Sequence, residues 1–276
     1  MEQRKLSRRT IFKTGVAALA AGTSGAYGSF ALPKAPGETR VLFLVGDYWH
    51  NGSAQELHWR GVLSPTGWRL LFAQSSQFVT PQSLGEADLF VVARYDGPDS
   101  VGFTPDGIVE KRSEGAPWMT DEQEVAIVEN VTRRGMGLLH MHCSTWNPEK
   151  KRYMELMGIV KPIMHGPVQR VRIHDLNQEH PITKGIGEFV IDLDENFGVE
   201  LDKGRTTVLF KSTGEQDKRT DVAAWCLDAG KGRAVGLHFG HVPQPFHRPE
   251  VKTVMWRSAH WAMQRDIPPS DFKPGY

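Results

Sequence analysis

The chain has 276 residues, of which 39% are hydrophobic and 24% charged, and this composition is typical of a globular protein with a sizeable core. Its net charge of +1 excludes the strongly basic balance of proteins that bind nucleic acid or acidic membrane surfaces. Two cysteines, Cys143 and Cys226, are too few for a disulfide scaffold, although one bridge between them stays open. Beyond the N-terminal region no apolar run is long enough for a membrane span, so we expect no nucleic-acid partner and no stable membrane association.

Residues 1–31 have the features of a bacterial signal peptide. Basic residues come first, a weakly apolar run rich in Ala and Gly follows, and Ser29-Phe30-Ala31 fits a small-residue cleavage site. The stretch Ser7-Arg8-Arg9-Thr10-Ile11-Phe12-Lys13 resembles the twin-arginine export signal. We therefore expect export to the periplasm or another extracytoplasmic compartment by the twin-arginine route, the alternative being a disordered basic tail. Residues 32–39 are expected to form a linker at the start of the mature chain.

Strand and helix patterns alternate through about residue 158. Residues 40–45 form a short, wholly apolar run, which indicates a strand buried on both faces, as in a parallel sheet. A helix is predicted to begin at Thr120, where Gln123 completes a capping box. The other elements expected here are strands at 68–73, 88–93 and 138–141 and a helix at 53–63. This alternation predicts an α/β fold with right-handed crossovers.

The second half of the chain is richer in strands. They are predicted at 167–173, 206–211, 221–227 and 233–239, before a final amphipathic helix at 249–264. Residues 96–119 are rich in Gly, Pro and charge, and this stretch is a candidate lid or rim loop near a site.

Polar clusters follow several of the predicted strands. Ligands of an open α/β sheet bind beyond the carboxyl ends of its strands, so these clusters are candidate site segments. They are Asp47-Tyr48-Trp49-His50, His142-Cys143-Ser144-Thr145-Trp146, Asp192-Leu193-Asp194-Glu195-Asn196 and Gly240-His241, with His165 just before another strand.

The order and spacing of several motifs resemble the ThuA-like, or trehalose-utilisation, domain family. The motifs are Thr120-Asp-Glu-Gln123, Gly137-Leu-Leu-His-Met-His142, His180-Pro-Ile-Thr-Lys-Gly185, Asp194-Glu195 and Gly230-Lys-Gly-Arg233 through Gly240-His241. The resemblance predicts a ThuA-like domain over residues 40–266, followed by a C-terminal tail at 267–276. It implies a three-layer flavodoxin-like fold, similar to class I glutamine amidotransferases, with a central, mostly parallel sheet.

The resemblance also implies a role in the catabolism of trehalose and other glycosides, and a metal in some members. The family's motif histidines and acid pair would fall on His50, His142, His165, Asp194, Glu195 and His241. The chain departs from the family pattern at Asn196-Phe197, where a tyrosine often follows the acid pair, and at Cys143, where a small residue is usual.

The histidines are candidates for both metal binding and proton transfer, because neutral imidazole binds divalent metals and titrates near physiological pH. We expect His50, His142 and His241, with Glu195 or Asp194, to surround one pocket. His142, His241, Glu195 and Asp194 are the catalytic candidates. His50, His142, His241 and Glu195 are the candidate ligands of a divalent metal, zinc above all. No tight pattern such as HExxH is present, so each histidine could instead cap a strand or hydrogen-bond a loop.

Cys143 is a second, weaker candidate for chemistry. A cysteine beside His142, after a buried strand, resembles the nucleophile turn of amidotransferase-like folds. The small residues of that turn are missing, because Met141 and Thr145 occupy their places. Cys143 is therefore predicted to be a small wall residue, and Cys226 a core residue.

The candidate substrate-binding residues are Asp47, Trp49, Tyr95, Trp146 and His165. A flat aromatic ring can lie against the C–H face of a sugar while its edge stays wet. We expect an exported enzyme that acts on a glycoside or keto-sugar, a prediction in which the sugar comes from the resemblance. Its reaction would be proton transfer or metal-assisted carbonyl chemistry, as an isomerase, lyase or hydrolase. A non-catalytic sugar-binding accessory protein and an amidase-like hydrolase using Cys143 are the alternatives, and homo-oligomer formation stays open.

Overall fold

The computed structural model describes residues 33–47, 49–95, 102–103, 109–110, 118–143, 149–269 and 271–272. The predicted signal peptide, Trp146 and most of the 96–119 stretch lie outside the described residues. Among the described helices, none combines the length and the apolar character that crossing a membrane requires.

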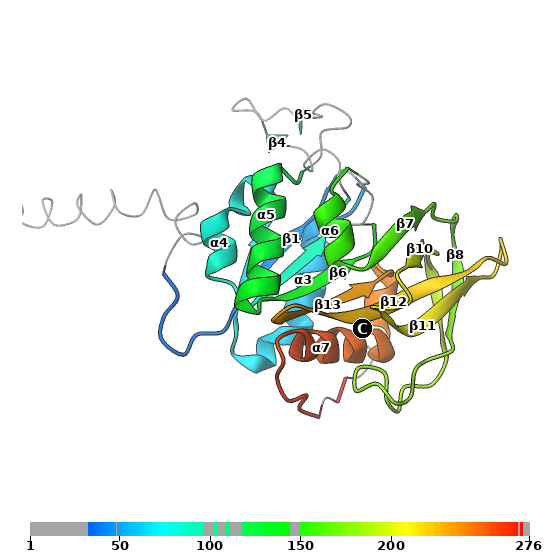
Figure 1. The fold of residues 1–276 in the computed structure, drawn as a ribbon. Coiled ribbons are helices and arrows are strands. Elements are labelled where there is room, and N and C mark those ends of the chain that lie inside the picture. The colour runs from blue at the N-terminus through cyan, green and yellow to red at the C-terminus, as the bar shows by residue number, and fades with distance from the viewer. Residues whose placement is uncertain are drawn as a thin grey trace, which may run out of the picture.

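A nine-stranded sheet forms the centre of the fold (Figure 1). Its parallel half has the order β2 (Arg69–Ala73), β1 (Arg40–Val45), β3 (Leu89–Ala93), β6 (Gly137–Met141) and β13 (Gly232–Leu237). In chain order this is the 2-1-3-4-5 arrangement of flavodoxin-like sheets. The predicted α/β class and its parallel core are therefore confirmed.

An antiparallel half extends the sheet beyond β13. It consists of β12 (Thr220–Ala229), β11 (Thr207–Gly214), β8 (Val168–His174) and β9 (Phe189–Glu195). This extension is the strand-rich second half that the sequence predicts. β9 runs as far as Glu195, so the acidic pair Asp194-Glu195 belongs to the strand itself and not to a turn after it.

Helices cover both faces of the sheet and make three layers (Figure 1). One face packs against α3 (Gly52–Leu63) and α7 (Pro249–Ala262), the other against α4 (Pro81–Gly85), α5 (Asp121–Glu129) and α6 (Lys151–Leu156). The remaining elements are η1 (Ser64–Thr66), η2 (Ser76–Phe78), η3 (Asn130–Arg134), η4 (Gln244–His247) and the strand pairs β7 (Ile159–Ile163) with β10 (Gly198–Leu201) and β4 (Gly102–Phe103) with β5 (Val109–Glu110).

The wholly apolar sequence of β1 follows from this layering. Successive side chains of a strand point to opposite faces, so Val41 and Phe43 enter the core beneath α3 and α7. Leu42 and Leu44 enter the core on the other face. All six residues of β1 are buried, as a strand covered on both faces requires.

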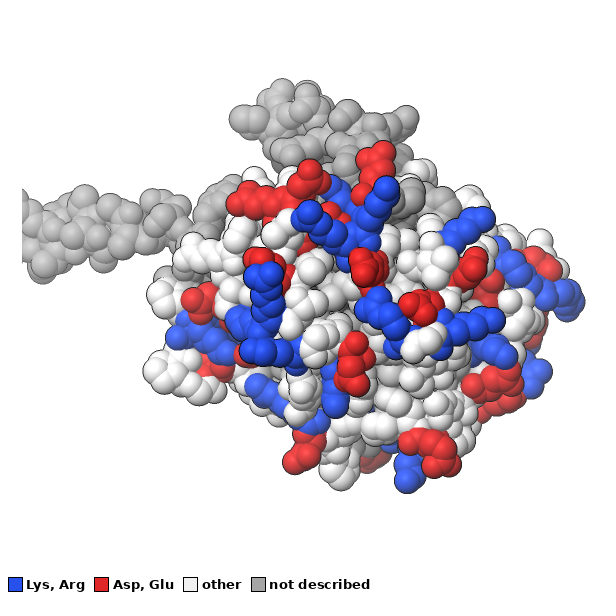
Figure 2. Space-filling model, viewed as in Figure 1, with Lys and Arg blue, Asp and Glu red and all other residues white. Residues whose placement is uncertain are grey.

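Helix α5 begins as predicted. The Thr120 side chain accepts a hydrogen bond from the amide of Gln123, and the Gln123 side chain accepts one from the amide of Thr120. On the surface, Figure 2 shows Lys and Arg interspersed with Asp and Glu over the described part of one face, in keeping with the net charge of +1.

Candidate functional site

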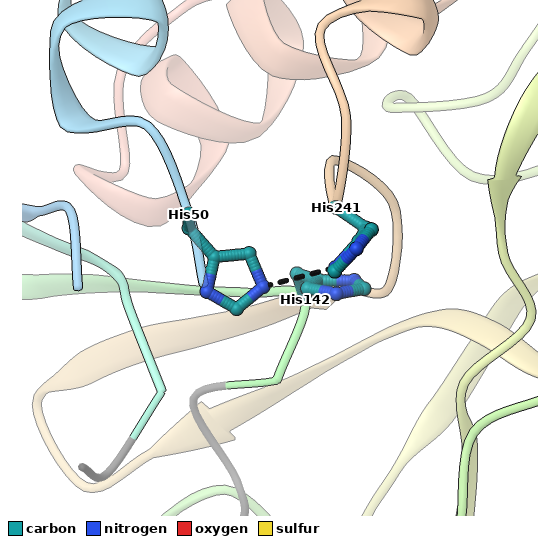
Figure 3. A group of neighbouring side chains, drawn as sticks. All are labelled: His50, His142 and His241. Atoms are coloured by element: carbon teal, nitrogen blue, oxygen red, sulfur yellow. Dashed lines mark hydrogen bonds between the residues drawn. The ribbon is translucent and has the colours of Figure 1, made fainter. Parts of the chain in front are cut away.

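Three histidines from distant segments meet beyond the carboxyl ends of the parallel strands (Figure 3). His50 follows β1, His142 follows β6 and His241 follows β13. Nε2 of His50 lies 3.2 Å from Nδ1 of His241, and the ring centroids of His50 and His142 are 5.1 Å apart. One ring nitrogen from each histidine lies within 4.8 Å of a ring nitrogen of each of the other two. The structure thus brings these three residues together, as the sequence predicts.

The histidines line a cavity of about 470 Å³, a volume suited to a small molecule. The lining consists of Trp49, His50, Tyr95, His142, Cys143, Met164, His165, Glu195, Phe197 and His241. Of the residues predicted for the site, Asp47 and Asp194 are buried outside this lining, and Trp146 is outside the described residues.

Glu195 connects three of the histidines. Its Oε1 lies 3.1 Å from Nδ1 of His165, and its Oε2 lies 3.4 Å from both Nε2 of His142 and Nδ1 of His241. Burial raises the pKa of the Glu195 carboxyl, while the charges of His165 and His50 oppose that rise. A carboxyl group placed among imidazoles in this way can accept or return a proton.

His142 occupies an unusual position at the end of β6. Its φ is 47°, in the left-handed region that few residues other than glycine adopt. Both of its ring nitrogens are buried and have no hydrogen-bond partner among the described residues. Burial, with the neighbouring His50 and His241, lowers its pKa well below the ordinary value. A buried, neutral and unpartnered imidazole is suited to bind a metal or to accept a proton.

His241 is positioned through its backbone. The amides of Gly240 and His241 donate to the two carboxylate oxygens of Asp194 at 2.9 and 3.0 Å. Burial raises the pKa of Asp194 to about 7, and burial together with His50 and His165 lowers the pKa of His241 to about 4. Asp194 therefore holds the loop that carries His241.

Asp47 lies behind His50. Its Oδ2 is 2.6 Å from Nδ1 of His50, and the same carboxylate accepts the amides of Trp49, His50 and Tyr95. Asp47 is buried and is not among the residues that line the cavity, and its carboxylate oxygens bind these groups of the protein.

Cys143 lies against His50, with Sγ 3.5 Å from Nε2 and 3.7 Å from Nδ1. Burial, followed by the charge of Asp47, raises the pKa of its thiol well above the ordinary value. A thiol held protonated is a poor nucleophile, so this geometry gives the cysteine hydrolase alternative no support. Both cysteines are free, and Cys226 is buried in β12, as predicted for a core residue.

Two wall residues were not predicted from the sequence. Met164 and Phe197 line the cavity, and Phe197 stacks on the ring of His165 with centroids 5.2 Å apart. The backbone carbonyl of Phe197 in turn accepts a hydrogen bond from Nδ1 of the buried His238 at 3.3 Å. Each wall residue is within two positions of a predicted site residue, and that proximity is the signal that could have found them.

The donor atoms fit a divalent metal. Donors bound to zinc at about 2.0–2.1 Å in a tetrahedron are about 3.3 Å apart. The nitrogens of His50 and His241 are 3.2 Å apart, and Oε2 of Glu195 is 3.4 Å from the facing nitrogens of His142 and His241. His142, whose ring nitrogens make no hydrogen bond within the described residues, completes a set of three imidazoles, a kind of ligand that divalent zinc accepts.

Solved structures share the fold at low sequence identity. A ThuA-like protein from Bacteroides uniformis superposes with a TM-score of 0.62 at 15% identity, covering 84% of this chain and 94% of that one. A ThuA-like protein from Parabacteroides merdae gives 0.62 at 16% identity, covering 85% and 93%. A cytoplasmic protein from Salmonella typhimurium gives 0.53 at 15% identity, covering 81% and 99%.

The family assignment comes from the sequence itself. No curated protein matches the chain. The sequence profile of ThuA, described as trehalose utilisation, matches residues 73–262, which include β6 with His142, the acidic pair of β9 and the loop of His241. The chain belongs to the ThuA, or trehalose-utilisation, family.

Proposed function

We propose that this chain is an enzyme of carbohydrate metabolism that transfers protons on a glycoside or keto-sugar, as an isomerase, lyase or hydrolase. The observation that carries the proposal is the convergence of His50, His142, His241 and Glu195 on one cavity. Proton transfer by a positioned side chain contributes about 10²–10⁴-fold to a rate, and histidine and glutamate are the usual groups.

The pKa directions support a division of roles among these residues. His142 and His241 have lowered pKa values and are neutral near pH 7, so each can accept a proton. Glu195 has a raised pKa, so it holds a proton at higher pH than an ordinary carboxyl and can return one to the substrate. On a keto-sugar, an imidazole would accept the proton of the carbon beside the ketone, and the protonated Glu195 would supply one to a neighbouring oxygen or carbon.

The wall of the cavity suits a sugar. Trp49 is 62% exposed at the cavity and presents a flat apolar ring, while Tyr95 adds a polar tip. Apolar C–H faces of a pyranose can lie on such rings while its hydroxyl groups reach His165 and Glu195. The carbohydrate itself is proposed from the family, whose description is trehalose utilisation.

The same cavity would hold a divalent metal, zinc above all, with His50, His142 and His241 as its ligands. A bound metal would polarise the carbonyl group and lower the barrier to removing the adjacent proton. Glu195, which this ligand set leaves free, would then carry the proton in place of the imidazoles, and the other residues of the lining would orient the sugar and exclude water.

We also propose that the mature chain acts outside the cytoplasm. The support is the sequence Ser7-Arg8-Arg9-Thr10-Ile11-Phe12-Lys13 followed by an apolar run and small residues. Replacing Arg8 and Arg9 together by Lys should keep the full-length protein in the cytoplasmic fraction of a bacterial host. Equal export of both forms would contradict this part of the proposal.

The test of the activity is deuterium exchange. Purified mature protein is incubated in D₂O with a panel of keto-sugars and glycosides, and carbon-bound exchange and product formation are followed by proton NMR. We expect exchange or product with at least one sugar, and loss of both in Glu195→Gln. Sugar binding without exchange or product would contradict the enzyme and favour the accessory-protein alternative.

A further inference from the structure

Asp47 is a buried carboxylate that the proposed function leaves unexplained. It lies just beyond the carboxyl end of β1, is 3% exposed and is not among the residues that line the cavity. A buried carboxylate is costly unless its oxygens are fully hydrogen-bonded. Its partners therefore reveal which arrangement of the site the carboxylate stabilises.

Four donors surround the Asp47 carboxylate. Oδ1 accepts the amides of Trp49 at 2.7 Å and His50 at 3.1 Å. Oδ2 accepts the amide of Tyr95 at 2.6 Å and lies 2.6 Å from Nδ1 of His50. Backbone amides can only donate, so both oxygens are fixed as acceptors. A carboxylate has no hydrogen to donate, so Nδ1 of His50, 2.6 Å from Oδ2, is the atom that carries the hydrogen.

This hydrogen-bond pattern determines the tautomer of His50. With hydrogen on Nδ1, the neutral ring leaves Nε2 as a bare lone pair. That atom lies 3.2 Å from Nδ1 of His241 and faces the cluster drawn in Figure 3. The opposite tautomer would place a hydrogen where the cluster needs an acceptor or a metal ligand.

Asp47 also fixes where the ring is. It joins the loop after β1, through the amides of Trp49 and His50, to the amide of Tyr95 after β3. The segments that follow the neighbouring parallel strands β1 and β3 thus fix the Asp47 carboxylate, and this carboxylate fixes the ring of His50. Groups that orient a metal-binding or catalytic histidine through its second nitrogen in this way change affinity or activity about 10–100-fold when they are removed.

We propose that Asp47 is a positioning residue that selects the Nδ1–H tautomer of His50 and aims its Nε2 at the cluster, a role that rests on the proposed function of that cluster. Asp47 does not touch the substrate. Asn at this position would keep an acceptor for the amides of Trp49 and His50 but would turn a donor toward Nδ1, which favours hydrogen on Nε2.

The test is the tautomer of His50, read from two-bond proton–nitrogen NMR spectra of uniformly ¹⁵N-labelled mature protein at alkaline pH, where imidazole is neutral. The spectrum of His50 is identified among the 11 histidines by its absence in His50→Gln. We expect Nδ1–H in the wild type and Nε2–H in Asp47→Asn. Nε2–H in the wild type, or the same tautomer in both proteins, would overturn the proposal.

Zinc affinity gives a second readout. Asp47→Asn is expected to bind zinc about 10–100-fold more weakly than the wild type. The matched control is Asp88→Asn, because Asp88 also accepts a backbone amide, that of Arg40 at 2.8 Å, at the opposite end of β1. This control should lose stability but keep both the tautomer and the zinc affinity. Equal zinc affinity in Asp47→Asn and the wild type would also contradict the proposal.

The two proposals fail separately. If the wild type binds no zinc, the metal part of the proposed function is wrong. The NMR spectrum then still tests whether Asp47 selects the tautomer of His50. If Asp47→Asn does not fold, the wild-type spectrum decides alone, because an Nε2–H tautomer there is incompatible with the hydrogen bonds described.

Discussion

The Oε2 atom of Glu195 lies 3.4 Å from Nε2 of His142, and both side chains are almost inaccessible, with 9% and 3% exposure. An acid and an unpartnered imidazole thus face each other at the wall of the cavity. Their pKa values move in opposite directions, that of Glu195 upward and that of His142 downward, because burial disfavours the charged form of each. These shifts support the proposed transfer of a proton between this pair and a ligand.

Glu195→Gln keeps the shape of the side chain but removes its acid. We expect kcat for deuterium exchange to fall about 10²–10⁴-fold, because no other described carboxyl group lines the cavity. The rate is measured by NMR in D₂O. Glu200→Gln, an exposed position on β10, serves as the control and should leave the rate unchanged.

His142→Gln tests the metal site. Zinc that binds only the folded protein stabilises it by about 2.7 kcal/mol at 100 times its dissociation constant. The wild type should therefore melt at a higher temperature when zinc is added, and His142→Gln should show little or no increase. His174→Gln is the control, since His174 lies on β8 and bonds to Thr213 at 2.8 Å. Equal zinc-dependent shifts in wild type and His142→Gln would exclude His142 as a ligand.

Trp49→Ala tests the sugar-binding wall. Because Trp49 is 62% exposed, its removal should hardly change the melting temperature. Lost stacking of about 0.5–1.5 kcal/mol should raise KM about twofold to thirteenfold with kcat nearly constant. Leu57→Ala, 68% exposed on α3 and outside the cavity lining, is the matched control. A Trp49→Ala enzyme with wild-type KM would show that this ring does not contact the sugar.

Asp194 predicts a pH dependence of stability. Burial raises its pKa to about 7 in the folded state, against an unfolded value of 3.8, so the folded protein binds the proton more tightly. The stabilisation from this group is complete below pH 3.8 and is lost as pH rises through about 7. Melting temperatures measured across that range should fall less steeply with rising pH in Asp194→Asn than in the wild type. Identical slopes would contradict the raised pKa.

The parallel core of the fold was predictable because its signals are local. The apolar run of β1 predicts a buried strand, and the Thr120–Gln123 capping box predicts a helix start, each from a few consecutive residues. Ligands of such sheets bind beyond the carboxyl ends of the parallel strands, and this rule was enough to predict that His50, His142 and His241 lie together. The six-residue helix α6 and the β7–β10 pair were missed, because segments so short carry no periodicity of their own.

The roles of the two aspartates could not be derived from the sequence. Asp47 was expected to bind substrate and Asp194 to be catalytic, since both stand among polar residues at strand ends. Those roles stay predictions, but the structure shows that both carboxylates bind backbone amides, those of Trp49, Tyr95 and His241, and only the folded loops bring these amides within reach. Where a side chain points at a strand end depends on loop conformation, which sequence pattern does not encode.

The hydrogen bonds of Asp194 have a consequence for how the site is assembled. β9 is four places away from β13 in the sheet, a separation of about 19 Å if the sheet were flat. Yet Asp194 of β9 holds the loop that follows β13. The loop after β13 and the curvature of the sheet together bring β9 to this place, and the cavity has its full lining only once that outermost strand has paired, because the strand carries Glu195. Ligand binding at this site would therefore require the complete sheet. A chain in which β9 has not yet paired would have the three histidines but would lack Glu195 beside them.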